Sequence, residues 1–140
     1  MIILDTNVIS EPMRSHPDKT VMGWLDNQVA ESLFVTTTTL AELFAGVEML
    51  PDGKRKSGMG EQLNHLINRL FSNRILPFDH AAALNYARLL NNARKSGYVV
   101  SMGDGQIAAI ALAHGFSIAT RDIKPFMAAG LTVINPWDGI

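Results

Sequence analysis

The chain has 140 residues, 47% hydrophobic and 18% charged, which is typical of one globular domain spanning residues 1–140 and excludes a disordered tail. The absence of cysteine excludes disulfides, thiol catalysis and zinc–thiolate sites but does not fix the compartment. Because no apolar run reaches membrane-spanning or signal-peptide length, we expect a cytoplasmic protein with no membrane partner. The formal net charge is −1, so any contact with nucleic acid must be local or depend on bound cations.

The first predicted element is a short buried strand, residues 2–4, that ends at Asp5. Thr6 and Asn7 are turn and cap residues, so we expect a helix to start near Asn7. Asp5 would then lie at the carboxyl end of the first strand, where open α/β sheets bind their ligands. The alternative is a plain helix cap, in which the carboxylate accepts hydrogen bonds from the first amides of the helix.

Short apolar strands and helices alternate along the rest of the chain. The predicted strands are residues 33–36, 74–78 (a strand or a turn), 116–119 and 131–134. The predicted helices are a stretch opened by Asp18, then residues 40–50, 61–71, 81–96 (capped by Asp79), 106–114 and 125–129, with loops at 51–60 and 97–103. This alternation predicts a three-layer α/β domain with a mostly parallel central sheet.

Four acids from distant parts of the chain fall at the ends of these elements. Asp5 and Asp122 follow apolar strands, whereas Glu42 and Asp104 lie in the expected first turns of helices. Helices that follow parallel strands begin at the carboxyl edge of the sheet, so all four acids should converge there. Each has a structural alternative as a helix cap, and for Glu42 this is the capping-box spacing from Thr39.

Clustered carboxylates favour a bound cation. Two unit charges ~6 Å apart at an effective dielectric of ~20 repel by about 3 kcal/mol, so either some of the acids are protonated or cations lie between them. Oxygen-only ligation without cysteine suits Mg²⁺ or Mn²⁺. Such an ion would activate a water molecule for attack and offset charge on a phosphate.

Several short motifs, in this order, resemble the PIN-domain ribonucleases, and most closely the FitB-like members of the VapC toxins of bacterial toxin–antitoxin pairs. The motifs are LDTN at 4–7, AEL at 41–43, DGQIAAIA at 104–111 and TRD at 120–122, together with RILPFD at 74–79 and NPW at 135–137. The resemblance covers essentially the whole chain and implies a three-layer α/β/α PIN-like domain.

The same resemblance implies a Mg²⁺- or Mn²⁺-dependent endoribonuclease that hydrolyses RNA with a metal-activated water. It carries over Asp5, Glu42, Asp104 and Asp122 as the catalytic and metal-binding residues. It also implies a cognate antitoxin, a homodimer, and a higher assembly with antitoxin and operator DNA. Related FitB-like chains often have TRN-x-x-DF, and here Pro125 stands where that pattern has an acid, so Asp122 would carry the fourth role, directly or through water.

Two other functions fit parts of the sequence. A phosphoryl-transfer enzyme could use Asp5 as a covalent nucleophile, as haloacid-dehalogenase-like phosphatases do, but Asn7 stands where those have a second Asp. A non-catalytic protein that binds RNA or a regulator is the other alternative. The four histidines are scattered and predict no metal or catalytic site. Arg121 either neutralises Asp122, holds a phosphate or is a plain surface charge, and Trp137 is expected to pack against other side chains and not to stack on a base.

Overall fold

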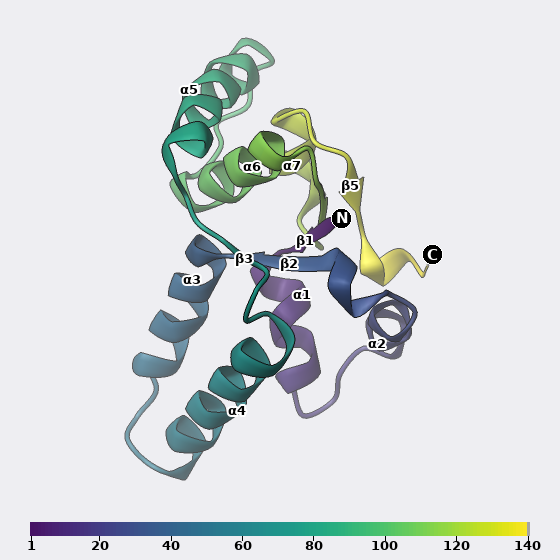
Figure 1. The fold of residues 1–140 in the computed structure, drawn as a ribbon, viewed down its shortest axis with the longest axis vertical. Helices are drawn as coiled ribbons and strands as arrows, with labels where there is room; N and C mark the ends of the chain where they lie inside the picture. Colours follow the sequence, from purple (N-terminus) through teal and green to yellow (C-terminus); the bar gives the residue numbers. More distant parts are fainter. Residues whose placement is uncertain (140) are drawn as a thin grey trace.

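A computed structural model, which describes residues 1–139, has a five-stranded parallel sheet at its centre (Figure 1). The strand order is β3-β2-β1-β4-β5, and every neighbouring pair is parallel. The strands are β1 (Ile2–Leu4), β2 (Leu33–Thr36), β3 (Ile75–Leu76), β4 (Ser117–Ala119) and β5 (Val133–Ile134). Because all five run in the same direction, the residues that follow them emerge at one edge of the sheet.

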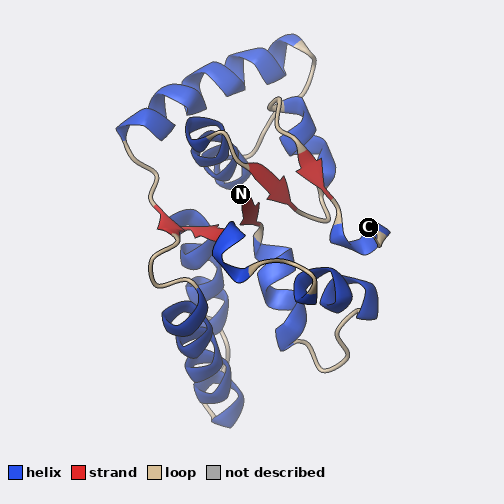
Figure 2. Cartoon of the chain, turned by 45° about the vertical axis from the view of Figure 1, so that its right-hand side comes forward, coloured by secondary structure: helices blue, strands red, loops and turns tan. Residues whose placement is uncertain are grey.

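Helices cover both faces of this sheet (Figures 1 and 2), which confirms the predicted three-layer arrangement. The α-helices are α1 (Thr6–Ser10), α2 (Lys19–Asp26), α3 (Thr37–Glu48), α4 (Lys54–Leu70), α5 (His80–Lys95), α6 (Met102–His114) and α7 (Ile123–Ala128). Three short 3₁₀ turns are η1 (Glu11–Met13), η2 (Ala30–Ser32) and η3 (Pro136–Asp138). Among residues 1–139, no helix has both the length and the apolar composition that a bilayer crossing needs.

Two hydrophobic cores lie on the two faces of the sheet, because successive strand residues point to opposite sides. Ile3 and Ile118 belong to the core beneath α5, α6 and α7. Their neighbours Leu4 and Ala119 belong to the core formed with α1, α2, α3 and α4. Helix α6 is buried through residues 107–111, which explains its nearly uniform apolar sequence.

The predicted loop at residues 51–60 is wrong, since α4 already begins at Lys54 and only residues 51–53 connect it to α3. The first turns of α4 are polar and contain two glycines, so their sequence has no helical apolar spacing. Contacts with α3 compensate: the Lys56 ammonium donates to the Glu48 carbonyl at 2.9 Å. The buried Leu63 then anchors the helix to the core.

Other boundaries shift by one to four residues. Helices α3 and α6 begin earlier than predicted, at Thr37 and Met102, because Thr36 and Ser101 cap them. As predicted, Asp79 caps α5, with its carboxylate accepting from the Ala82 amide at 3.0 Å.

A buried glutamate fixes the turn between α1 and α2. Glu11 is only 3% exposed, and its carboxylate accepts from the Asp18 amide at 2.8 Å and from the Arg14 guanidinium at 3.1 and 3.2 Å. The hydrogen bond from Asp18 is the largest cause of a lowered pKa of Glu11; burial opposes it and Arg14 adds to it. Since Asp18 in turn caps α2, Glu11 sets where that helix starts.

Replacing this carboxylate, as Glu11→Gln, should lower the melting temperature at pH 7. A carboxyl group whose pKa is lowered by folding stabilises the protein above its unfolded pKa, and this stabilisation is lost as the pH falls through the folded value. The gap between mutant and wild type should therefore close on acidification, as followed by thermal melts across pH. The control Glu48→Gln removes an 84%-exposed carboxylate that pairs with Lys56 at 3.7 Å, and should have almost no effect. A gap that stays constant with pH would contradict this role of the Glu11 charge.

Candidate active site

Asp5 lies directly after β1, buried at 6% exposure. One carboxylate oxygen, Oδ1, accepts from the Thr6 amide at 2.8 Å, so the predicted cap role is present. The other oxygen, Oδ2, accepts from the Thr120 hydroxyl at 2.8 Å. Because Leu4 pairs with Ala119, Asp5 and Thr120 are the next residues along on two neighbouring strands, and the sheet register alone brings them together.

The pKa of Asp5 is raised from 3.8 to about 6, mainly because burial removes water from the carboxylate. The hydrogen bonds from Thr120 and Thr6 oppose this rise. The negative charges of Asp104 and Glu42 add to it. Three acids from separate elements therefore lie close enough together to feel one another's charge.

Glu42 was predicted in the first turn of α3, but it lies in the second turn. The capping-box alternative is also wrong: the Thr36 hydroxyl caps α3 by accepting from the Thr39 amide at 3.0 Å, which leaves Glu42 outside the cap. The Glu42 carboxylate instead accepts from the Thr6 hydroxyl at 2.8 Å. A Cβ added at Gly103 would lie 3.0 Å from Glu42 Oε1, so the Glu42 carboxylate lies against the start of α6.

Asp104 and Asp122 complete the acidic edge. Asp104 is in the first turn of α6, as predicted, but Ser101 is the cap, with its hydroxyl accepting from the Asp104 amide at 3.3 Å. Burial raises the pKa of Asp104, the Ser101 side chain opposes this, and the charge of Asp122 adds to it. Asp122 precedes α7, its side chain makes no capping hydrogen bond, and its amide donates to the Thr120 hydroxyl at 3.1 Å.

Of the four acids, only Asp5 therefore caps a helix. The four side chains supply only oxygen donors, which is the ligand chemistry that Mg²⁺ or Mn²⁺ needs. A cation would offset the repulsion among them and the cost of burying Asp5 and Asp104. Within residues 1–139, however, no three Asp, Glu or His side chains are arranged so that a single ion would touch all of them. The case for a divalent cation at this edge therefore rests on the oxygen donors and on sites that two carboxylates could form together.

Thr120 and Asn7 complete this edge and were not among the predicted site residues. The Asn7 amide group donates to the Thr120 hydroxyl at 3.4 Å and accepts from the Arg121 main chain at 3.3 Å. The signal for Thr120 was its position after an apolar strand, which matches that of Asp5. Only the pairing of β1 with β4 turns that signal into a contact.

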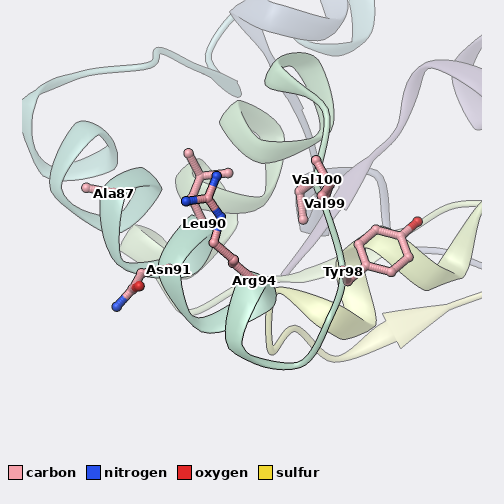
Figure 3. Close-up of a pocket in the computed structure, with 7 residues that line it drawn as sticks. All are labelled: Ala87, Leu90, Asn91, Arg94, Tyr98, Val99 and Val100. Carbon is pink, nitrogen blue, oxygen red and sulfur yellow. The ribbon is translucent and has the colours of Figure 1, made fainter.

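A separate hollow of about 400 Å³ lies between the second half of α5 and the segment that leads into α6 (Figure 3). Arg94 lies on the α5 side, and Tyr98 lies across from it on the other segment. None of the four acids lines this hollow, so the candidate active site is the acidic edge of the sheet.

The PIN domain profile matches residues 2–129, most of the chain. The chain belongs to the PIN-domain family. Three relatives of this PIN domain are similar along their whole length. It is 51% identical to the plasmid stability protein StbB of Pseudomonas syringae pv. tomato and 47% identical to the VapC ribonuclease Y4jK of Sinorhizobium fredii, over 138 residues and 99% of each chain. It is 45% identical to the toxin FitB of Neisseria gonorrhoeae over 137 residues, covering 98% of this chain and 99% of FitB.

Solved structures agree with this assignment. The PIN domain superimposes on FitAcB from Neisseria gonorrhoeae with a TM-score of 0.94 and 45% identity, covering 98% of this chain and 99% of the other. FitAB bound to an IR36 DNA fragment gives the same TM-score of 0.94 at 44% identity, covering 98% and 96% of the two chains. The PIN fold expected from the motifs is thereby confirmed.

Proposed function

We propose that this protein is a divalent-metal-dependent endoribonuclease, the toxin of a type II toxin–antitoxin pair, acting on cytoplasmic RNA. The observation that carries the proposal is the set of four acids gathered at one sheet edge of a PIN-domain chain that is 47% identical to a VapC ribonuclease. The Mg²⁺ or Mn²⁺ requirement and the site residues Asp5, Glu42, Asp104 and Asp122 are part of this proposal.

Asp5 and Asp104 are the proposed direct ligands, because both are desolvated and both feel a neighbouring acid. Mg²⁺ usually keeps several waters and binds one or two carboxylates, so Glu42 and Asp122 are assigned to the same site through water. When bound, the ion would supply a more acidic water and offset negative charge on the phosphate. The protein orients its ligands itself: Thr120 holds Asp5 and Thr6 holds Glu42, each at 2.8 Å.

The chemistry of the products tests this proposal. Hydrolysis by an activated water should leave a 5′-phosphate and a 3′-hydroxyl on labelled RNA fragments. A 2′,3′-cyclic phosphate would indicate attack by the RNA 2′-hydroxyl and would reject the proposed chemistry. A phosphoenzyme trap tests the alternative in which Asp5 is a covalent nucleophile; we expect no phosphorylated protein.

We further propose that the partner is an antitoxin, that the protein forms a homodimer, and that toxin and antitoxin together bind operator DNA. The similarity to FitAB bound to DNA supports this. An apolar groove of about 290 Å³ between α1, α2 and α4 is suited to an amphipathic antitoxin helix; its lining includes Val8, Ile9, Met22, Leu25, Leu66 and Leu70. Light scattering should give a dimer, and expression from the native operon should yield a copurifying partner; a monomer without a partner would count against the assembly.

Removing the Thr120 hydroxyl, as Thr120→Val, should lower cleavage by about 10- to 100-fold, the usual effect of losing a group that orients a metal ligand. The change also leaves the Asp122 amide and Asp5 Oδ2 without a buried partner, so the melting temperature should fall. Initial rates and thermal melts measure the two effects. The exposed Thr132→Val is the matched control and should behave like wild type. A Thr120→Val enzyme of full activity would contradict the positioning role.

A further inference from the structure

Arg121 is held next to the acidic edge by an aromatic ring. Its guanidinium carbon lies 5.1 Å from the centre of the Trp137 ring, within the range of a cation–π contact. Among residues 1–139, this exposed arginine forms no ion pair, although the next residue is Asp122. The ring therefore holds the guanidinium while its N–H donors stay unpaired in the part of the chain that the structure describes.

The sheet topology places this pair at the active edge. Ala119 pairs with Ile134 in neighbouring parallel strands, so the segments that follow, with Arg121 and Trp137, emerge at the same edge as Asp5. The Arg121 amide donates to Asn7 at 3.3 Å, which fixes the start of the side chain.

Trp137 is a firm support for the guanidinium. The Asn135 side chain accepts from its amide at 3.0 Å, and its ring packs against the core that contains Leu4 and Trp24. A guanidinium held on a fixed ring loses less freedom when it binds a planar or tetrahedral anion.

The active edge is acidic, and the Arg121 guanidinium adds a positive charge beside it. The protein has a net charge of −1 and the active edge is acidic, so a positively charged side chain beside the edge would favour binding of a polyanionic RNA in addition to any bound cation. Arginine binds phosphate oxygens with paired N–H donors, and Arg121 directly precedes the acidic Asp122 in the chain.

Resting on the proposed ribonuclease function, we propose that Arg121, held on Trp137, binds a backbone phosphate of the RNA beside the bond that is cut. It is a substrate-binding residue, so its loss should raise KM and leave kcat close to wild type. The contact is to the sugar–phosphate backbone and carries no base preference of its own.

The test is binding of a fluorescein-labelled single-stranded RNA pool of mixed sequence, measured by anisotropy across salt concentrations in an Asp5→Asn background that should not cut it. Arg121→Met should weaken binding about ten-fold and reduce the slope of log affinity against log salt by about 0.7, the contribution of one phosphate contact on a single strand. Arg121→Lys keeps the charge but not the planar fork, so the slope should stay while affinity falls. Trp137→Leu should resemble Arg121→Lys.

Arg55→Met is the matched control, because Arg55 is exposed in the first turn of α4. If Arg121→Met and Arg55→Met bind RNA alike, or if Arg121→Met changes affinity with no change of slope, the phosphate contact is refuted. Cleavage of the same RNA pool by the wild-type protein would then show that the ribonuclease proposal survives. If Asp5→Asn does not bind the RNA and the wild-type protein does not cut it, both proposals fail. Arg121 is exposed, so its variants should fold even where Trp137→Leu does not.

Discussion

Replacing Asp5 with asparagine should reduce RNA cleavage by more than about 100-fold while leaving the melting temperature in EDTA unchanged or higher. Activity is lost because the proposed site loses a charged ligand at its most buried position. Stability is kept because asparagine can still accept from the Thr6 amide, which is the capping bond of α1.

The free-energy terms favour the mutant in EDTA. A pKa raised from 3.8 to about 6 means that the ionised Asp5 destabilises the fold at neutral pH by about 3 kcal/mol, at 1.36 kcal/mol per unit. Asparagine carries no charge, so this cost of burying an ionised carboxylate disappears. It also points N–H donors at the Thr120 hydroxyl, which already accepts from Asn7 and Asp122, at a cost of about 1 kcal/mol.

The pH dependence in EDTA gives a second readout of the same change. A raised folded pKa stabilises the protein fully below the unfolded value of 3.8, and this stabilisation is lost as the pH rises through about 6. The melting temperature of wild type should therefore rise relative to that of Asp5→Asn as the pH falls from 7 towards 4. Asp79→Asn, which alters an exposed cap of α5, is the control and should keep activity. A mutant that melts well below wild type at pH 7 in EDTA would show that the Asp5 charge supports the fold.

Adding Mn²⁺ should raise the melting temperature of wild type strongly and that of Asp5→Asn little. Four acids whose charges oppose one another gain most from a cation, and a ligand stabilises the folded state only as far as it binds. At about 100 times the dissociation constant this amounts to about 2.7 kcal/mol. Thermal melts with calorimetric titration measure it.

Asp79→Asn is again the control for Mn²⁺ and should respond like wild type, since its carboxylate caps α5 and its charge is not among those that raise the pKa of Asp5 or Asp104. Equal stabilisation of wild type and Asp5→Asn by Mn²⁺ would place the ion elsewhere on the protein. A flat titration of wild type would reject a metal site altogether.

The strands and the gathering of the acids were predictable from sequence because both depend on local patterns. Short apolar runs ended by cap residues mark the strands, and parallel strands send the residues that follow them to one edge. Asp5 and Asp104 lie where this reasoning placed them, although their catalytic role remains a proposal.

The errors come from choices that only tertiary contacts decide. Four consecutive threonines offered several caps for α3, and Thr36 is the one because it also ends β2, paired with Leu76. This moved Glu42 into the second turn and out of the capping box. The polar first turn of α4 contacts α3 through Lys56, and such a tertiary contact is not revealed by periodicity. The contact of Thr120 with Asp5 follows from the register between β1 and β4. That register cannot be read from either strand alone.

The most direct measurement compares cleavage of one labelled RNA by wild type and Asp5→Asn, each in EDTA and in Mn²⁺. If the acidic edge is a divalent-metal ribonuclease site, wild type with Mn²⁺ should be the one active combination, and adding Mn²⁺ after EDTA should restore it. Equal cleavage by wild type in EDTA and in Mn²⁺, or full cleavage by Asp5→Asn, would contradict this account.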